Sequence, residues 1–135
     1  DPESGKSGRN QVIESIIRRR GHPAFRQTLL AAYDFRCAIS NSNALDVLEA
    51  ACIAPYRGKH TYAPSNGLLL RSDLHTLFDL GKLAIDTRSM TVVIANDLLE
   101  SNYRLLAGRP LRLPKDSELN PGIEALDLHR RLAGL

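Results

Sequence analysis

The residues best suited to chemistry lie near the middle of the chain, where His75 and Asp79 stand four positions apart. On a helix this spacing places the two side chains about 40° apart around the axis, on one side. An imidazole nitrogen and a carboxylate oxygen are both suitable ligands for a divalent cation. The pair therefore predicts either a metal-binding face or a local hydrogen bond within the helix.

Asn66 lies nine positions before His75, where a polar loop meets an apolar run. Its amide is suited to hold the loop through hydrogen bonds to main-chain groups. Asn-Gly is also an ordinary turn dipeptide, so Asn66 by itself indicates little. Together with His75 and Asp79 it favours a compact site where a loop, a strand and a helix meet.

Apolar spacing and turn residues predict the elements that would position this site. Residues 1–9 are rich in Gly, Ser and charge and lack periodicity, so we expect a flexible linker or an artificial chain edge there, ahead of one domain over 10–135. The expected elements are helices over 12–20, 23–33, 72–80 and 121–132, with Ser72 as an N-cap, strands over 45–53 and 67–70, a polar loop over 56–65, and a hairpin of 82–86 and 91–95.

The composition narrows the class of protein. At 135 residues, with 43% apolar and 24% charged residues, the chain is typical of one soluble globular domain and excludes a disordered tail or a disulfide scaffold. No segment approaches the roughly 20 apolar residues of a membrane span, so we expect no membrane partner. The two cysteines, Cys37 and Cys52, form no CxxC pair, which favours a reducing compartment.

The positive charge is concentrated in the first half of the chain. Residues 1–71 hold ten Lys and Arg against six Asp and Glu, whereas residues 72–135 hold eight against nine. This asymmetry favours a polyanionic partner, although arginine runs are also common on solvated surfaces.

The segment LEAACIAPYRGKHTYAPSNGLLLRSDLHTLFDLGKLAID, residues 48–86, resembles the HNH endonucleases of the ββα-metal nuclease superfamily. It is most similar to the branch that carries LEAAHI followed by NGLLLR and HTLFD. The preceding FRQTLLAAYDFRCAIS, residues 25–40, is similar to the lead-in of that branch. The resemblance covers about residues 21–86, with a core at 37–86.

This resemblance implies an α+β fold with a ββα-metal nuclease core, flanked by N-terminal helices, extra short strands and a C-terminal helix. It implies metal-dependent hydrolysis of DNA by a restriction or defence enzyme of the bacterial cytoplasm. The cofactor would be one divalent ion, with Mg²⁺ or Mn²⁺ preferred over Zn²⁺ or Ni²⁺. The partner would be DNA, with an N-terminal DNA-recognition domain in a longer protein, and a homodimer stays open.

The resemblance also assigns roles to single residues. It makes His75 a ligand of the catalytic metal, Asp79 a further ligand, and Asn66 the residue that orients the loop. The general-base histidine of the family should follow Ala51, where this chain has Cys52. A thiol with a pKa of about 8.5 is only a few per cent ionised at pH 7, so it is a poor base for activating water.

Three interpretations of Cys52 stay open. It is an engineered replacement of the base, or a natural variant in which His60 from the adjoining loop serves as the base, or the mark of an inactive site. The third interpretation gives the alternative function, a nuclease-inactive DNA-binding module.

Charged residues complete the predicted site, each with ordinary surface charge as the alternative. Ala51 stands where many HNH relatives carry an acidic metal ligand, so Glu49 on the same strand face is a candidate ligand. Arg71, at the end of the second strand, is placed to reach the scissile phosphate. The candidates for contacts to the DNA backbone are Arg57, Lys59 and the run Arg18 to Arg20.

Overall fold

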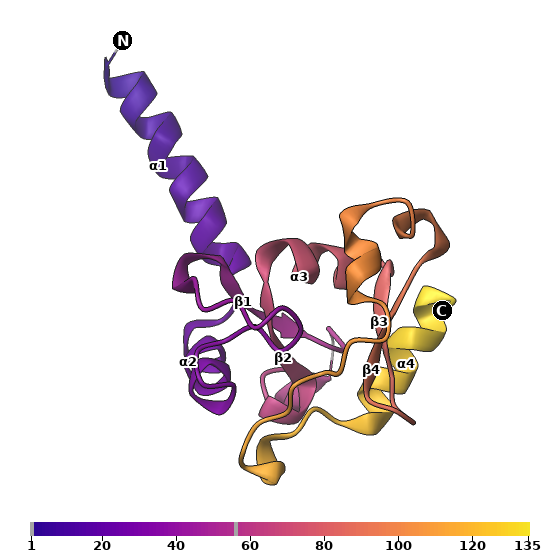
Figure 1. Ribbon diagram of the computed structural model, residues 1–135. Coiled ribbons are helices and arrows are strands. Elements are labelled where there is room, and N and C mark those ends of the chain that lie inside the picture. Colours follow the sequence, from indigo (N-terminus) through magenta and orange to yellow (C-terminus); the bar gives the residue numbers. More distant parts are fainter. Residues whose placement is uncertain (1, 56) are drawn as a thin grey trace.

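The computed structural model describes residues 2–55 and 57–135, and within them the chain forms helices and two small antiparallel sheets (Figure 1). This mixture is the α+β class that the sequence predicts. The order is α1 (Pro2–Arg19), α2 (Pro23–Ala32), β1 (Leu48–Cys52), β2 (Gly67–Arg71), α3 (Ser72–Asp79), β3 (Leu83–Asp86), β4 (Thr91–Ile94) and α4 (Ile123–Ala133), with short 3₁₀ turns between them.

β1 and β2 form the antiparallel hairpin on which the site is built. Their register pairs Leu48 with Arg71 at one end and Cys52 with Gly67 at the other. Both strands are buried over their first four residues, as expected for short apolar runs bounded by turns. α3 begins directly after β2, so the hairpin and the helix together form the ββα unit that the resemblance implies.

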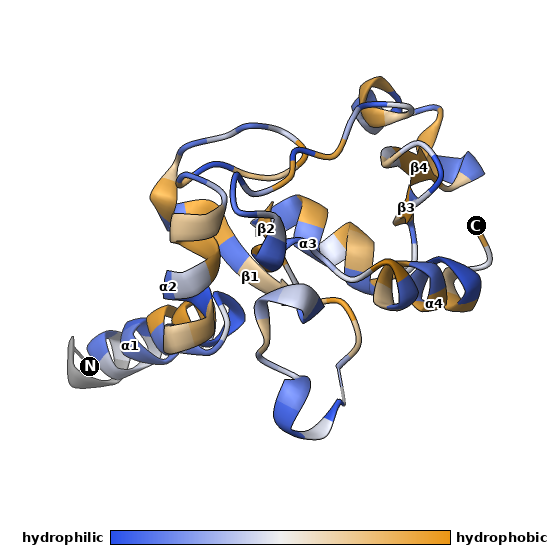
Figure 2. Cartoon of the chain, turned by 90° about the horizontal axis from the view of Figure 1, so that it is seen from below, coloured by the Kyte–Doolittle hydropathy of each residue, from blue (hydrophilic) through white to orange (hydrophobic). Residues whose placement is uncertain are grey.

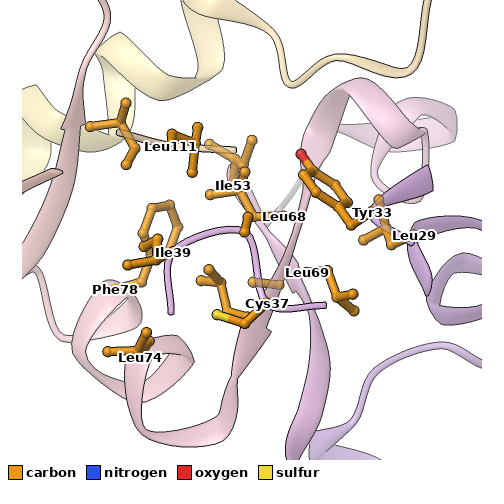
Figure 3. Packing of buried hydrophobic residues seen from close by; sticks show 14 of the residues in the cluster. Leu29, Tyr33, Cys37, Ile39, Ile53, Leu68, Leu69, Leu74, Phe78 and Leu111 are labelled. Carbon is orange, nitrogen blue, oxygen red and sulfur yellow. The ribbon is translucent and has the colours of Figure 1, made fainter. Parts of the chain in front are cut away.

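The main core lies around this hairpin, between α2 and α3 (Figure 3). Leu29 from α2, Leu69 from β2 and Phe78 from α3 are fully buried there. α2 can pack closely on β2 because residue 67 is a glycine. A Cβ added to Gly67 would lie 2.6 Å from the ring of Phe25.

β3 and β4 form the second hairpin, and α4 packs against β3. α4 mixes hydrophilic and hydrophobic residues along its length, as a surface helix does (Figure 2). His129 of α4 stacks on Phe78 of α3 with ring centroids 3.6 Å apart, and its Nε2 donates to the Phe78 carbonyl oxygen at 2.7 Å. No helix in the described part of the chain is long and apolar enough to cross a membrane.

α1 extends from the body of the protein as an arm, with the N-terminus at its far end (Figure 1). The linker predicted for residues 1–9 is therefore wrong from residue 2 onward, where the chain is already helical. A helix that is nucleated by the periodic segment after residue 10 propagates cheaply, because each further residue adds one hydrogen bond. The apolar residues of that segment are about half exposed; they are Val12, Ile13, Ile16 and Ile17.

β1 starts at Leu48 and not at residue 45 as predicted. The carbonyl oxygens of Leu45 and Asp46 accept hydrogen bonds from the side chains of Arg26 at 2.9 Å and Arg20 at 3.3 Å. These carbonyls are therefore engaged by arginines instead of a partner strand, and the segment forms a 3₁₀ turn.

The start of α3 and the polar loop differ in detail from the predictions. Ser72 is the first residue of α3 and not its N-cap, because β2 passes into the helix without a loop and the cap position falls on Arg71. The polar loop holds the 3₁₀ turns Gly58–His60 and Pro64–Asn66, and its residue 56 lies outside the described residues.

The turn after α1 determines where the arm ends. Gly21 has a φ of +102°, which favours glycine, and a Cβ added there would lie 2.9 Å from the Ala50 carbonyl oxygen. The Ala50 amide donates to the Arg20 carbonyl oxygen at 2.8 Å. This contact attaches the end of α1 to the edge of β1, and it brings Arg19 close to Glu49.

We expect Gly21→Ala to lower the free energy of unfolding by about 2–3 kcal/mol in urea denaturation, because it combines a strained φ with a clash against main chain. Gly108→Ala is the matched control. Gly108 has a φ of +77° but nothing within 4 Å of an added Cβ, so that variant should lose only about 1 kcal/mol. Equal losses at the two positions would contradict a role for the contact with Ala50.

Candidate functional site

A cleft of about 550 Å³ opens beside the end of β1 and is lined by the predicted catalytic residues Cys52 and His75 and by the predicted metal ligand Asp79. The end of α1, the turn into α2, β1, α3 and α4 all contribute to its walls. The other residues that line it are Arg18, Arg19, Gly21, His22, Phe25, Ala50, Ile53, Pro55, Tyr62 and His129. The tertiary structure thus brings together residues that are far apart in the sequence.

His75 is held from behind by Glu49. The two side chains are buried, with residue exposures of 5% and 4%, and His75 Nδ1 lies 2.7 Å from Glu49 Oε1. A carboxylate can only accept, so Nδ1 donates to Glu49, and Nε2 is the ring nitrogen that is left to face Asp79. Glu49 was predicted to be either a metal ligand or a solvated side chain. The structure places it instead as the partner that orients the imidazole, as carboxylates behind metal-binding histidines commonly do.

His75 Nε2 faces Asp79 Oδ2 at 3.3 Å, as the four-residue spacing predicts. Two lone pairs at this distance repel unless a proton or a cation lies between them. Two cis ligands of an octahedral ion stand about 3 Å apart, given bond lengths near 2.1 Å. The donor set therefore fits a divalent cation that is bound by one imidazole and one carboxylate.

The protein would supply only a minority of the ligands around such a metal ion. Within residues 2–55 and 57–135, no group of three or more His, Cys, Asp or Glu side chains is arranged to hold a metal ion. The remaining positions would fall to water and to substrate oxygens, which is the usual coordination of Mg²⁺ in phosphate chemistry.

Asp79 is an ionised carboxylate in this setting. Burial by itself raises the pKa of its carboxyl group, but the hydrogen bond and charge of His75 and then those of Arg19 outweigh burial. The pKa therefore lies below its ordinary value. Asp79 consequently offers a negative charge to the cleft at neutral pH.

Asn66 closes the loop that follows β1. Its Oδ1 accepts from the Ala54 amide at 3.0 Å, and its Nδ2 donates to the carbonyl oxygens of Ala54 at 2.8 Å and Thr61 at 2.9 Å. The side chain is 1% exposed, so these bonds satisfy a buried amide. Asn66 thus makes the main-chain bonds that the sequence predicts for it, and it holds the loop beside Cys52.

Cys52 is the last residue of β1 and is half-buried at the cleft. Its thiol points toward the Thr61 carbonyl oxygen, with Sγ 3.8 Å from that atom. Burial and then the negative charge of Asp79 raise the pKa of the Cys52 thiol. The side chain is therefore a neutral thiol at pH 7 and not a base.

Arg71 lies away from the cleft. The hairpin register places it at the opposite end from Cys52, and its guanidinium makes a bidentate ion pair with Asp73 at 2.6 and 3.0 Å. The Tyr103 hydroxyl donates to the same carboxylate at 2.8 Å. Arg71 is therefore not among the described residues that line the cleft.

The loop residues Arg57, Lys59 and His60 are exposed and lie beyond the cleft. Arg57 and His60 line a separate depression together with residues of α4, including Arg131. The structure therefore separates His60, the predicted alternative base, from Cys52 and His75. The imidazoles that share the cleft with Cys52, apart from His75, are His22 and His129.

Some residues of the site had no specific signal in the sequence. The pairing of Glu49 with His75 joins positions 26 apart, and the pairing of Arg19 with Asp79 joins positions 60 apart. The run Arg18 to Arg20 was a weak indication of such a pairing, because a basic residue at the end of a helix often has an acidic partner. His22 and His129 carried no distinguishing pattern.

Two comparisons with known proteins find a similarity in sequence family and in fold. Residues 37–86 match the family model of the HNH endonucleases. A solved structure titled as a modification-dependent TagI restriction endonuclease is similar with a TM-score of 0.60 and 24% identity, and the match covers 78% of this chain and 36% of that chain. At this identity the similarity concerns the fold. No curated protein matches the sequence.

We expect Asn66→Ala to lower the free energy of unfolding by about 1–3 kcal/mol, because it leaves buried main-chain groups of Ala54 and Thr61 without partners. Hydrogen exchange at the Ala54 amide should accelerate more than global unfolding explains. Asn10→Ala, at an exposed position of α1, is the control and should change stability little. An unchanged exchange rate at Ala54 would show that Asn66 does not hold the loop.

Alkylation of Cys52 by iodoacetamide in EDTA should require a higher pH than alkylation of a free cysteine, because the pKa of the thiol is raised. Asp79→Asn removes one of the two causes and should shift the rate profile toward lower pH. Cys52→Ser should abolish labelling, since Cys37 is fully buried. A profile that Asp79→Asn leaves in place would contradict the electrostatic part of this account.

Proposed function

We propose, from the match of residues 37–86 to the HNH endonuclease family model, that the chain is a metal-dependent DNA-cleaving domain of a restriction-type defence enzyme, weakened by Cys52. The observation that carries the proposal is the buried Glu49–His75 pair, which presents Nε2 to Asp79 in the cleft that Cys52 also lines. Hydrolysis of a phosphodiester needs a proton acceptor for water and a cation near the phosphate.

In this proposal the residues of the cleft have separate tasks. His75 and Asp79 would hold one divalent ion, with Mg²⁺ or Mn²⁺ the preferred choice, and Glu49 keeps the imidazole in the tautomer that binds it. The chemistry that such an ion supplies is the neutralisation of charge on the phosphate. Asn66 keeps the loop in the shape that leaves position 52 at the cleft.

Position 52 is where the water proton would be accepted. A neutral imidazole there would accept it readily at pH 7, because its ordinary pKa is about 6.5. The Cys52 thiol keeps its own proton at this pH, since burial and Asp79 raise its pKa. We therefore propose that this chain cleaves slowly at best, and that a histidine at position 52 would increase the rate.

The second candidate function is a DNA-binding module without nuclease activity. The raised pKa of the Cys52 thiol favours this second function, because a neutral thiol does not accept the proton of water. The basic residues at the end of α1 would still be available to contact DNA. The two functions differ in one observable. A pure binding module shifts the mobility of DNA and does not cut it with any metal.

We also propose that target choice resides outside this chain, in a DNA-recognition domain of a longer protein. The match to the restriction endonuclease covers 36% of that chain, which leaves room there for further domains. Contacts from arginines and lysines to phosphates position a duplex without reading its sequence.

Plasmid cleavage in Mg²⁺, Mn²⁺, Ni²⁺ or EDTA tests the proposed function. We expect Cys52→His to cut about 10²- to 10⁴-fold faster than the unmodified chain, which is the usual contribution of a general base. Adding His75→Ala to that variant, or adding EDTA, should abolish cutting. His60→Ala is the control and should change nothing, because His60 lies outside the cleft.

Two other results would contradict the proposal. If the unmodified chain already cuts as fast as Cys52→His, another group accepts the proton and the role of position 52 is wrong. If no variant cuts with any metal while all of them bind DNA, the DNA-binding module is the correct function.

A further inference from the structure

Arg19 is a cationic side chain of α1 that contacts the oxygen atoms on which the metal site depends. Its Nη1 donates to Asp79 Oδ2 at 3.0 Å, which is the same oxygen that faces His75 Nε2. Its Nε lies 3.7 Å from Glu49 Oε1, the oxygen that accepts from His75 Nδ1. One guanidinium thus lies against both carboxylates of the site and offsets part of their negative charge.

We infer that Arg19 competes with the divalent metal for Asp79 in the free protein, and that it transfers to a DNA phosphate when the duplex binds, so that DNA binding raises the affinity for the metal. This inference rests on the proposed function, because it takes His75 and Asp79 as the metal ligands. It adds a residue that lies outside the family match over residues 37–86.

The competition follows from charge and distance. The repulsion between a +1 and a +2 charge about 5 Å apart lowers the affinity for the ion more than about tenfold even in a water-like dielectric. Arg19 is bound to the ligand oxygen itself, so the ion must also break that hydrogen bond. The side chain of Arg19 is 42% exposed, so added salt screens part of the effect.

The transfer to DNA follows from the chemistry of guanidinium groups. A phosphate accepts two parallel hydrogen bonds from an arginine, whereas Asp79 receives only one from Arg19. Arg18 and His22 line the same cleft and add positive or donor groups near the place where a phosphate would enter. A duplex that takes the guanidinium leaves Asp79 free for the ion.

The end of α1 is held firmly enough for this exchange to involve the side chain alone. The hydrogen bond from Ala50 to Arg20 and the close approach of Gly21 to Ala50 attach the main chain next to Arg19 to β1. The side chain can therefore rotate between Asp79 and a phosphate without displacement of the helix. By linkage, the factor by which DNA strengthens metal binding equals the factor by which the metal strengthens DNA binding.

Two affinities measured on Arg19→Gln test this inference. Free Mn²⁺ measured by electron paramagnetic resonance at low salt should show binding at least about tenfold tighter than in the unmodified chain. Fluorescence anisotropy of a labelled duplex in EDTA should show weaker DNA binding. A residue that only supports the fold would not move the two affinities in opposite directions.

Three variants serve as controls. Arg9→Gln makes the same charge change on the exposed part of α1, about 15 Å away along the helix, and should leave Mn²⁺ affinity unchanged. Arg19→Lys keeps the charge and should bind Mn²⁺ nearly as weakly as the unmodified chain. His75→Ala should abolish the tight Mn²⁺ site.

The possible failures are distinguishable. If Mn²⁺ binding does not respond to His75→Ala, the proposed metal site is wrong and this inference falls with it. If binding depends on His75 but Arg19→Gln leaves it equal or weaker, the competition is overturned while the proposed function stands. If Arg19→Gln binds DNA no more weakly than Arg9→Gln, the transfer to phosphate is overturned.

Discussion

The buried hydrogen bond between Glu49 and His75 is the contact on which the site depends, because it links packing to chemistry. Each of these groups would be costly to bury without a partner, so α3 can lie against β1 only when the bond is made. The same bond fixes the tautomer that turns Nε2 toward Asp79. The ββα unit therefore folds and orients its metal-binding nitrogen through one interaction.

The end of β1 is the second constraint. The Asn66 side chain bonds to main-chain groups of the loop that follows the strand. This loop approaches the Cys52 thiol through the Thr61 carbonyl oxygen, and the charge of Asp79 also acts on that thiol. For an imidazole at position 52, burial would lower the pKa and the Asp79 carboxylate would raise it, so the two effects would oppose each other, whereas both raise the pKa of the Cys52 thiol. The same environment thus suits one type of base and disables the other.

The arm α1 reaches the two carboxylates of this centre through the side chain of Arg19. The turn at Gly21 attaches the arm to β1, and Arg19 places a positive charge against both Glu49 and Asp79. A site with two carboxylates needs such a charge when it is free of other cations. The exposed apolar residues of the same helix do not take part in this contact.

Short-range patterns in the sequence by themselves determined much of the secondary structure of this protein. The spacing of His75 and Asp79, the two apolar strands and the helix that follows them are short-range patterns. They predict the order strand, loop, strand and helix, and the resemblance to the HNH endonucleases implies the ββα unit. The tertiary structure decided the contacts between residues that are far apart in the sequence. It made Glu49 an orienting partner, brought Arg19 to Asp79, and placed His60 and Arg71 away from the cleft. The reason is physical: periodicity sets the face on which a side chain lies, but only the register of the hairpin and the packing of helices on it determine which faces meet.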